Sequence, residues 1–381
     1  MASRLYPATK KLFCQVVNAL CQFGYDSVLS PLSLGLLAVY VTGLIVLDKR
    51  QTSNRIASWL PARSHDALNR LLRTISISTR VLMSQLICWA KRLKLKGYLV
   101  IDDVVVEKPF SKNISWVGWT YSTIRREKVL GFHIVVLLWC TGAWRIPVAF
   151  RIWRPKKACA PGRYQTKGQL AWEMIVEVVN QGLLIEYIVF DSFYTAGWMT
   201  KRINRLGISW VGVLDPRTKL CYRNKHFKAL KLAEWIDLSW RGKLALRATS
   251  IIAYLPKYGT LKLVVTRNRH GNYEVIATNQ LGSDLTTIVN RKRARWSVET
   301  LFRDAKQLAG LGACQCRADQ AMVHHVAFCF IAFSLLQLLR LHPEEKLGEV
   351  KERLQKEVIS GGMIPPQPLK GKVKTDLLLT A

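Results

Sequence analysis

Four carboxylates stand in or beside segments that are otherwise apolar or cationic. Asp102 and Asp103 interrupt the apolar run 98–106, Asp191 ends the apolar run 183–190, and Glu299 lies among cations in a helical segment. A buried carboxylate is costly unless it is paired or binds a metal ion. Carboxylate oxygens bind Mg²⁺ or Mn²⁺, and two such ions about 3.5 to 4 Å apart promote phosphoryl transfer. The pattern therefore predicts a two-metal site for phosphodiester chemistry.

The three aspartates also have ordinary structural interpretations. Because successive side chains of a strand point to opposite faces, only one of Asp102 and Asp103 can face a given site. Asp103 fits an acid at an exposed sheet edge, and Asp191 fits the N-cap of a following helix. Both interpretations stay open at this point.

Glu299 belongs to a polar stripe on a predicted helix. With residues placed roughly 100° apart around the axis, Arg295, Glu299, Arg303 and Lys306 fall within roughly 80° of one another, beside an apolar arc. One interpretation is a solvated face with ion pairs between residues four apart. The other is a carboxylate ligand flanked by cations that hold DNA phosphates.

These acids need a sheet and helices to position them. Residues 98–106, 129–140 and 144–152 read as three antiparallel strands, the last two joined by a turn at Gly142. A helix over 169–180, a strand over 183–190 and a helix over 196–206 follow. Asp191 then lies beyond the carboxyl end of a strand, where ligands bind in open α/β sheets.

The residues before about 95 are predicted to be helical. Thr52 or Ser53 begins a helix over 51–60, and Ser64 caps a second one. This pair is typical of a helix-turn-helix, although an ordinary basic helical hairpin fits equally well. Its arginines would lie along DNA phosphates; they are Arg63, Arg70, Arg73 and Arg80.

Composition indicates a folded protein with a polyanionic partner. Lys and Arg number 57 against 25 Asp and Glu, a net charge of +32, yet 50% of the residues are hydrophobic. Such a charge favours nucleic acid as the partner. Nine scattered cysteines are typical of a reducing compartment, which predicts a bacterial cytoplasmic, nucleoid-associated protein. Phosphate-loop, HExxH, GxSxG and dinucleotide-binding motifs do not occur, which argues against ATP-driven and serine-hydrolase chemistry.

Two less favoured function classes remain. Residues 27–47 and 321–339 are apolar enough to span a bilayer, so a membrane protein is one alternative. Core helices of large soluble domains share this composition. The other alternative is a catalytically inactive, basic DNA-binding remnant.

The late helix resembles a signature of the DDE transposases of bacterial insertion sequences. Arg295, Glu299 and Lys306 match its arginine, three residues, glutamate, six residues, lysine spacing, and Lys292 stands in place of its tyrosine. The segment IDDVVVEKP resembles the first-aspartate strand, with Val104 where a threonine is common. VFDSFYT resembles the second-aspartate strand. The likeness extends over roughly residues 53–341.

This resemblance implies an α/β, RNase H-like core, a mixed sheet flanked by helices, in which three acids bind metal and catalyse. They are Asp102, with Asp103 as the alternative, Asp191 and Glu299. It implies Mg²⁺ or Mn²⁺, contacts from Lys292, Arg295, Arg303 and Lys306 to DNA phosphates, and recognition of terminal inverted repeats. Double-stranded DNA would be the partner and a homodimer the synaptic unit.

The expected organisation has five parts. They are a helical DNA-binding region (1–95), the first part of the core (96–207), a β-rich insertion (208–285), the closing helices of the core (286–345), and a charged helix with a tail (346–381). Within the insertion, Trp210, Trp235 and Trp240 could stack on an unpaired base, or pack in the core.

Overall fold

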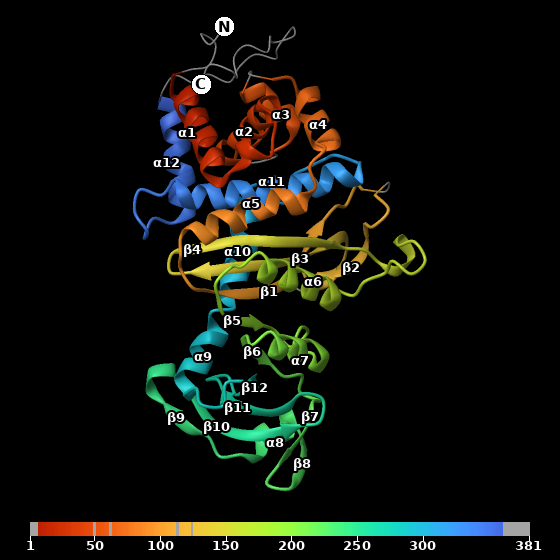
Figure 1. The fold of residues 1–381 in the computed structure, drawn as a ribbon, viewed down its shortest axis with the longest axis vertical. Coiled ribbons are helices and arrows are strands. Elements are labelled where there is room, and N and C mark those ends of the chain that lie inside the picture. Colours follow the sequence, from red (N-terminus) through yellow and green to blue (C-terminus); the bar gives the residue numbers. More distant parts are fainter. Residues whose placement is uncertain (1–6, 49–50, 61–62, 112–113, 123–124, 361–381) are drawn as a thin grey trace.

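The computed structural model describes residues 7–48, 51–60, 63–111, 114–122 and 125–360. These residues form a mixed α/β structure around a sheet of twelve strands (Figure 1). The strand order is β2-β3-β1-β5-β6-β12-β11-β10-β7-β8, with β4 paired to β3 and β9 to β10. Helices form one end of the elongated molecule and β10, β11 and their neighbours the other.

The central five strands have the mixed arrangement of an RNase H-like core. They are β4 (Trp144–Trp153), β3 (Glu127–Thr141), β1 (Gly97–Glu107), β5 (Ile185–Phe190) and β6 (Ser209–Val213). β1, β3 and β4 pair antiparallel, whereas β1, β5 and β6 pair parallel. The strands predicted over 98–106, 129–140, 144–152 and 183–190 are therefore confirmed. The short edge strand β2 (Gly118–Ser122) had not been predicted.

Helices cover both faces of this sheet (Figure 1). α6 (Lys167–Asn180) packs on β3 and β4, and α10 (Trp296–Leu308) packs on β1 from the other side. α6 begins two residues earlier than predicted, because Thr166 and Gln169 form a reciprocal capping box. α7 (Gly197–Arg205) connects β5 to β6, as predicted from its spacing.

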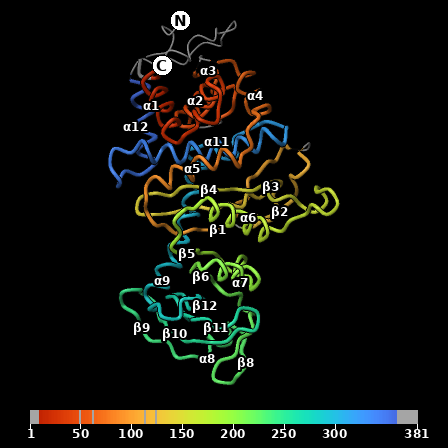
Figure 2. Tube along the Cα trace, viewed as in Figure 1, coloured from red at the N-terminus to blue at the C-terminus, as the bar shows by residue number. Residues whose placement is uncertain are grey.

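The N-terminal helices pack against the C-terminal ones, so the two ends of the described chain lie side by side (Figure 2). The helices are α1 (Pro7–Phe23), α2 (Pro31–Val46), α3 (Ser53–Trp59), α4 (His65–Thr74), α5 (Thr79–Arg92), α11 (Asp319–Leu338) and α12 (Leu347–Ser360), with a 3₁₀ turn at Tyr25–Ser27. Thr52 and Ser64 cap α3 and α4, which confirms both predicted starts.

The two most apolar helices are α2 and α11, and they pack on each other. α11 is long and apolar enough to cross a membrane, but 89% of its apolar window is buried inside the protein. α2 is shorter, and twelve of its residues are buried. Burial on all sides explains why both sequences are apolar all round.

The closing helices expected over 286–345 do not form one continuous run. α9 (Leu285–Arg293) precedes α10, and an irregular segment separates α10 from α11. Gly310 and Gly312 adopt φ of 72° and 103°, a backbone conformation that glycine tolerates and a helix does not. This break lets α11 leave α10 and enter the helical layer.

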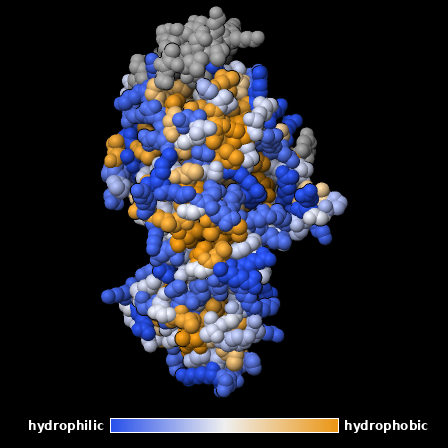
Figure 3. All heavy atoms as spheres, in the orientation of Figure 1, coloured by the Kyte–Doolittle hydropathy of each residue, from blue (hydrophilic) through white to orange (hydrophobic). Residues whose placement is uncertain are grey.

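The residues between β6 and α9 continue the central sheet through pairing of β12 with β6. The elements are β7 (Lys219–Tyr222), β8 (Lys225–Lys228), α8 (Ala229–Trp235), β9 (Ser239–Arg241), β10 (Leu246–Leu255), β11 (Gly259–Arg267) and β12 (Tyr273–Thr278). A 3₁₀ turn at Gly242–Leu244 lies between β9 and β10, and another, at Lys156–Ala158, follows β4. A hairpin turn around Gly271 joins β11 to β12. On the face seen in Figure 3, hydrophilic side chains cover the narrow region around β5 and α7.

Two paired glycines of β2 and β3 allow a test of the close strand packing beside β1. A Cβ on Gly131 would lie 2.5 Å from the Val106 carbonyl oxygen, whereas one on Gly118, its partner, would meet no atom within 4 Å. We expect Gly131→Ala to lower the free energy of unfolding by about 2 kcal/mol, because backbone must shift. Gly118→Ala is the control and should change it by less than about 0.5 kcal/mol. Equal denaturation midpoints for the two variants would refute this account.

Candidate active site

Asp102 and Asp191 lie on adjacent parallel strands at matching positions. Ile101 of β1 is in register with Phe190 of β5, so the residue that follows each is an aspartate, Asp102 within β1 and Asp191 directly beyond the end of β5. Neighbouring strands lie about 4.8 Å apart, which brings the two carboxylates to the same edge of the sheet. This is the position beyond the end of β5 where the sequence predicted a ligand site.

Glu299 reaches this edge through Arg295. Arg295 is the residue before α10, and its Nη1 donates to Asp102 Oδ2 at 2.7 Å. The other terminal nitrogen of the same guanidinium donates to Glu299 Oε1. The i,i+4 ion pair expected for a solvated face is therefore present, but it also binds a buried acid of β1. Residues about 200 positions apart thus meet around one guanidinium.

The electrostatics of the two aspartates reflect burial and mutual repulsion. Burial, and then the charge of Asp191, raises the pKa of Asp102 to about 7, although Arg295 opposes the shift. Burial likewise raises the pKa of Asp191, which backbone N–H groups and Arg295 partly offset. A cation between the two carboxylates would relieve this repulsion.

Asp191 also organises the turn that follows β5. Its Oδ1 accepts hydrogen bonds from the backbone N–H of Phe193 at 3.0 Å and of Tyr194 at 3.3 Å. The N-cap of α7 is Ala196, so Asp191 caps a turn rather than the helix. The alternative interpretation of Asp191 as a helix cap is therefore wrong in detail.

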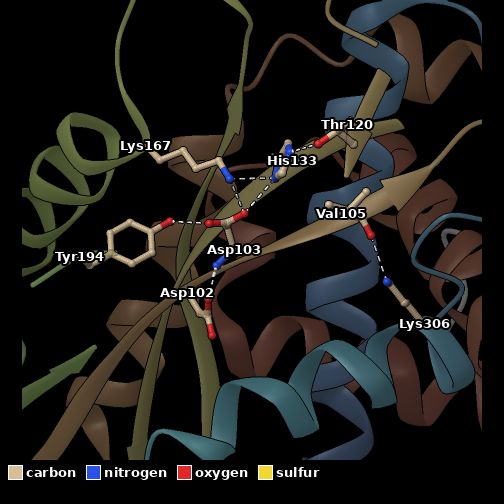
Figure 4. Close-up of polar contacts among 8 residues, drawn as sticks. All are labelled: Asp102, Asp103, Val105, Thr120, His133, Lys167, Tyr194 and Lys306. Carbon is tan, nitrogen blue, oxygen red and sulfur yellow. Dashed lines mark hydrogen bonds and ion pairs between the residues drawn. The ribbon is translucent and has the colours of Figure 1, made fainter. Parts of the chain in front are cut away.

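Asp103 points to the opposite face of β1 from Asp102 (Figure 4). Its carboxylate contacts His133 Nδ1 at 2.9 Å, Lys167 Nζ at 2.7 Å and the Tyr194 hydroxyl at 3.0 Å. Burial alone would raise the pKa of Asp103, but the bonds from His133 and Lys167 bring it below its usual value. Asp103 was expected to be exposed at a sheet edge, but its side chain is only 16% exposed and both carboxylate oxygens accept hydrogen bonds. Sequence reasoning missed its three partners, of which only His133, a polar residue within an apolar strand, gave a signal.

The predicted phosphate-binding cations have different surroundings. Lys306 Nζ donates to the Val105 carbonyl at 3.0 Å (Figure 4), and burial lowers its pKa. The Lys292 ammonium is paired with the Glu274 carboxylate at 2.6 Å. The Arg303 side chain donates to Asp304, and it is 60% exposed. Of the arginines near α4, Arg70 is exposed, whereas Arg63 is 7% exposed. Arg63 therefore does not present its guanidinium to a ligand surface in this conformation.

The three tryptophans expected in the insertion differ in burial. Trp210 is fully buried, stacks on Phe190 and donates its indole N–H to Asn204, so it is a core residue. Trp235 and Trp240 are 49% and 63% exposed. Trp240 is thus the more accessible of the two, because Phe227 and the Lys225 ammonium lie against the Trp235 ring.

The carboxylates of Asp102, Asp191 and Glu299 are suitable ligands for a hard divalent cation, but their oxygens do not surround a single point in this conformation. Among the residues that the structure describes, no three His, Cys, Asp or Glu side chains converge closely enough to hold a metal ion. Asp102 and Glu299 instead share the Arg295 guanidinium. The chemistry of the carboxylates fits Mg²⁺ or Mn²⁺, with Arg295 balancing the charge.

A mixed sheet with aspartates on two adjacent central strands and a glutamate on a following helix defines the class of RNase H-like nucleases and transposases. Comparison with protein families agrees. Residues 34–229, just over half of the chain, match the family described as DDE superfamily endonuclease, and residues 168–335 match the transposase DDE domain. The chain therefore belongs to the DDE endonuclease and transposase superfamily. A search of curated proteins finds no match.

Proposed function

We propose that the protein is a bacterial insertion-sequence transposase that binds the terminal inverted repeats of its element, cuts the DNA there and joins the freed 3′-hydroxyl to a target strand. The observation that supports this most is the position of Asp102 and Asp191 at matching places on adjacent strands, with Asp102 linked to Glu299 through Arg295. Cut-and-paste transposition also agrees with the excess of cations. It would act in the cytoplasm on nucleoid DNA.

Asp102, Asp191 and Glu299 would hold one or two divalent ions. Bound ions supply Lewis-acid stabilisation of the attacking and leaving oxygens. Within the chain, Asp102 and Asp191 provide oxygens from neighbouring strands, while Arg295 orients Asp102 and Glu299 and neutralises excess negative charge. Since Arg295 contacts both acids, its guanidinium would have to shift toward a DNA phosphate as Glu299 joins the site.

The surrounding cations would bind the DNA backbone. Arg303 and Arg70 expose their guanidinium groups, and Lys292 lies beside Ser192 and Glu274 in a pocket of about 420 Å³ next to Asp191. Lys306 would act from its bond to the Val105 carbonyl of β1, three residues after Asp102. Recognition of two element ends would require two protomers, so we propose a homodimer in the synaptic complex.

The test is cleavage of a duplex that carries the inverted repeat flanking the gene. We expect strand cleavage with Mg²⁺ or Mn²⁺ and a loss of at least about 10³-fold when the ions are chelated, since the acids alone cannot stabilise the phosphoryl transition state. Binding should be measured in parallel by fluorescence anisotropy. Cutting that persists in chelator would refute the metal mechanism, and binding without cutting would identify the inactive remnant instead.

A further inference from the structure

Tyr194 is hydrogen-bonded to two aspartates, Asp191 of the candidate site and Asp103 on the opposite face of β1. Its backbone N–H donates to Asp191 Oδ1 at 3.3 Å, and its hydroxyl donates to Asp103 Oδ1 at 3.0 Å. The side chain is 1% exposed, so its ring position is determined by packing. Tyr194 therefore connects Asp103, on the face of β1 opposite Asp102, to the turn that carries Asp191.

That turn needs side-chain support because it lies outside the sheet. β5 ends at Phe190, and neither β1 nor β6 pairs with the residues of the turn that follow Asp191. The far end of the turn is held at Thr195, whose hydroxyl donates to the Asp191 carbonyl at 2.6 Å and whose own carbonyl accepts from Tyr258 at 2.8 Å. At the near end, Asp191 Oδ1 accepts from the backbone N–H groups of Phe193 and Tyr194, and Tyr194 is in turn bonded outside the turn, to Asp103.

Asp103 is suited to anchor Tyr194 because it is itself held by several donors (Figure 4). Lys167 and His133 both contact Oδ2, which leaves Oδ1 to accept from Tyr194. His133 is fixed in turn by Thr120, 2.6 Å from its Nε2. The side chains of Asp103, His133 and Lys167 are each no more than 16% exposed. The anchor is thus rigid, and both of its oxygens are already engaged.

We infer that Asp103 is a positioning residue, not a metal ligand: through the Tyr194 hydroxyl it holds the turn so that the Asp191 carboxylate is aimed at the site beside Asp102. This inference rests on the proposed function, since it assigns Asp191 a metal to bind. It explains why two adjacent acids occur on β1. One faces the chemistry, and the other supports the acid of the next strand from behind.

The test is removal of one hydroxyl. Tyr194→Phe keeps the ring and the backbone N–H but breaks the bond to Asp103. We expect the dissociation constant for Mn²⁺ alone, measured by titration calorimetry, to rise about tenfold, as for loss of a supporting contact at other metal sites. Amide hydrogen exchange in residues 191–195 should accelerate about tenfold. Tyr25→Phe is the matched control, because it removes another buried hydroxyl bond, to the Leu82 carbonyl, far from the site; both values should stay within twofold of wild type.

Asp103→Asn separates a positioning role from a ligand role. If Asp103 positions, this variant should bind Mn²⁺ about tenfold more weakly, because its amide N–H₂ must face either Lys167 or the Tyr194 hydroxyl, where the carboxylate had an accepting oxygen on both sides. Excess Mn²⁺ should restore binding. If it loses Mn²⁺ as completely as Asp191→Asn, the inference is overturned. Unchanged affinity and unchanged exchange in Tyr194→Phe would also overturn it. If the variants show these shifts but the wild-type protein cuts no DNA, the proposed function is refuted while the positioning role stands. If the wild-type protein binds no Mn²⁺, the exchange rates of residues 191–195 decide.

Discussion

Asp191→Asn should abolish DNA cleavage while leaving the fold and DNA binding intact. We expect a loss of at least about 10³-fold in the cleavage rate, because an amide oxygen is a much weaker ligand than a carboxylate for a hard cation. The amide keeps an oxygen that accepts from Phe193 and Tyr194, so the turn should survive. Single-turnover cleavage and anisotropy with the same duplex measure the two properties.

A matched control is available at a second aspartate of the same geometry. Asp215 also accepts a backbone N–H two residues ahead, from Arg217 at 2.8 Å, but it lies in an exposed turn. Asp215→Asn should therefore cleave within about twofold of wild type, a change expected for surface sites. If both variants lose activity equally, the loss reflects unfolding or surface charge and not the site. If Asp191→Asn remains active, Asp191 is not a ligand.

Lys351→Met should cause the largest loss of stability that we expect from a single substitution. Lys351 of α12 is 3% exposed, and its ammonium donates to the carbonyls of Leu47 at 2.7 Å and Leu308 at 2.8 Å. These carbonyls end α2 and α10, so one side chain caps two helices, one of which carries Glu299. Methionine fills the space but leaves the Leu308 carbonyl without this donor. We expect a loss of about 3 kcal/mol at pH 7 by chemical denaturation.

The same lysine should make the difference depend on pH. Burial lowers its pKa from 10.5 to about 8, partly offset by Asp48. Between pH 8 and 10.5 the unfolded chain therefore holds more protons at this site than the native protein, and wild-type stability gains with rising pH. The deficit of Lys351→Met relative to wild type should accordingly widen over this range, by on the order of 3 kcal/mol.

Lys356→Met on the same helix is the control. Lys356 is exposed and paired with Glu352 at the i,i+4 spacing, so its loss should cost less than about 0.5 kcal/mol at any pH tested. A deficit that stays constant, or narrows, from pH 8 upward would contradict the lowered pKa. Equal stability of Lys351→Met and wild type would show that the buried ammonium does not stabilise the two helix ends.

Local pattern was enough to predict most of the central elements. The β-rich apolar runs over β1 and β3 and the capping residues Thr52 and Ser64 depend on neighbours in the chain, and all four appear as expected. The break at Gly310 and the short edge strand β2 were missed. Both are set by packing: Gly310 faces Gln51 and Leu44, and β2 exists through its pairing with β3.

For the candidate site, too, some features could be predicted from the sequence and others could not. Sequence by itself determined which acids could do chemistry, because a carboxylate in an apolar strand and a glutamate in a cationic helix are visible without coordinates. Only the tertiary structure decided that Asp102 meets Arg295 while Asp103 meets Tyr194 and Lys167. The reason is physical: strand alternation places the two aspartates on opposite faces, but which face receives α10 and which receives α6 depends on contacts between residues far apart in the chain.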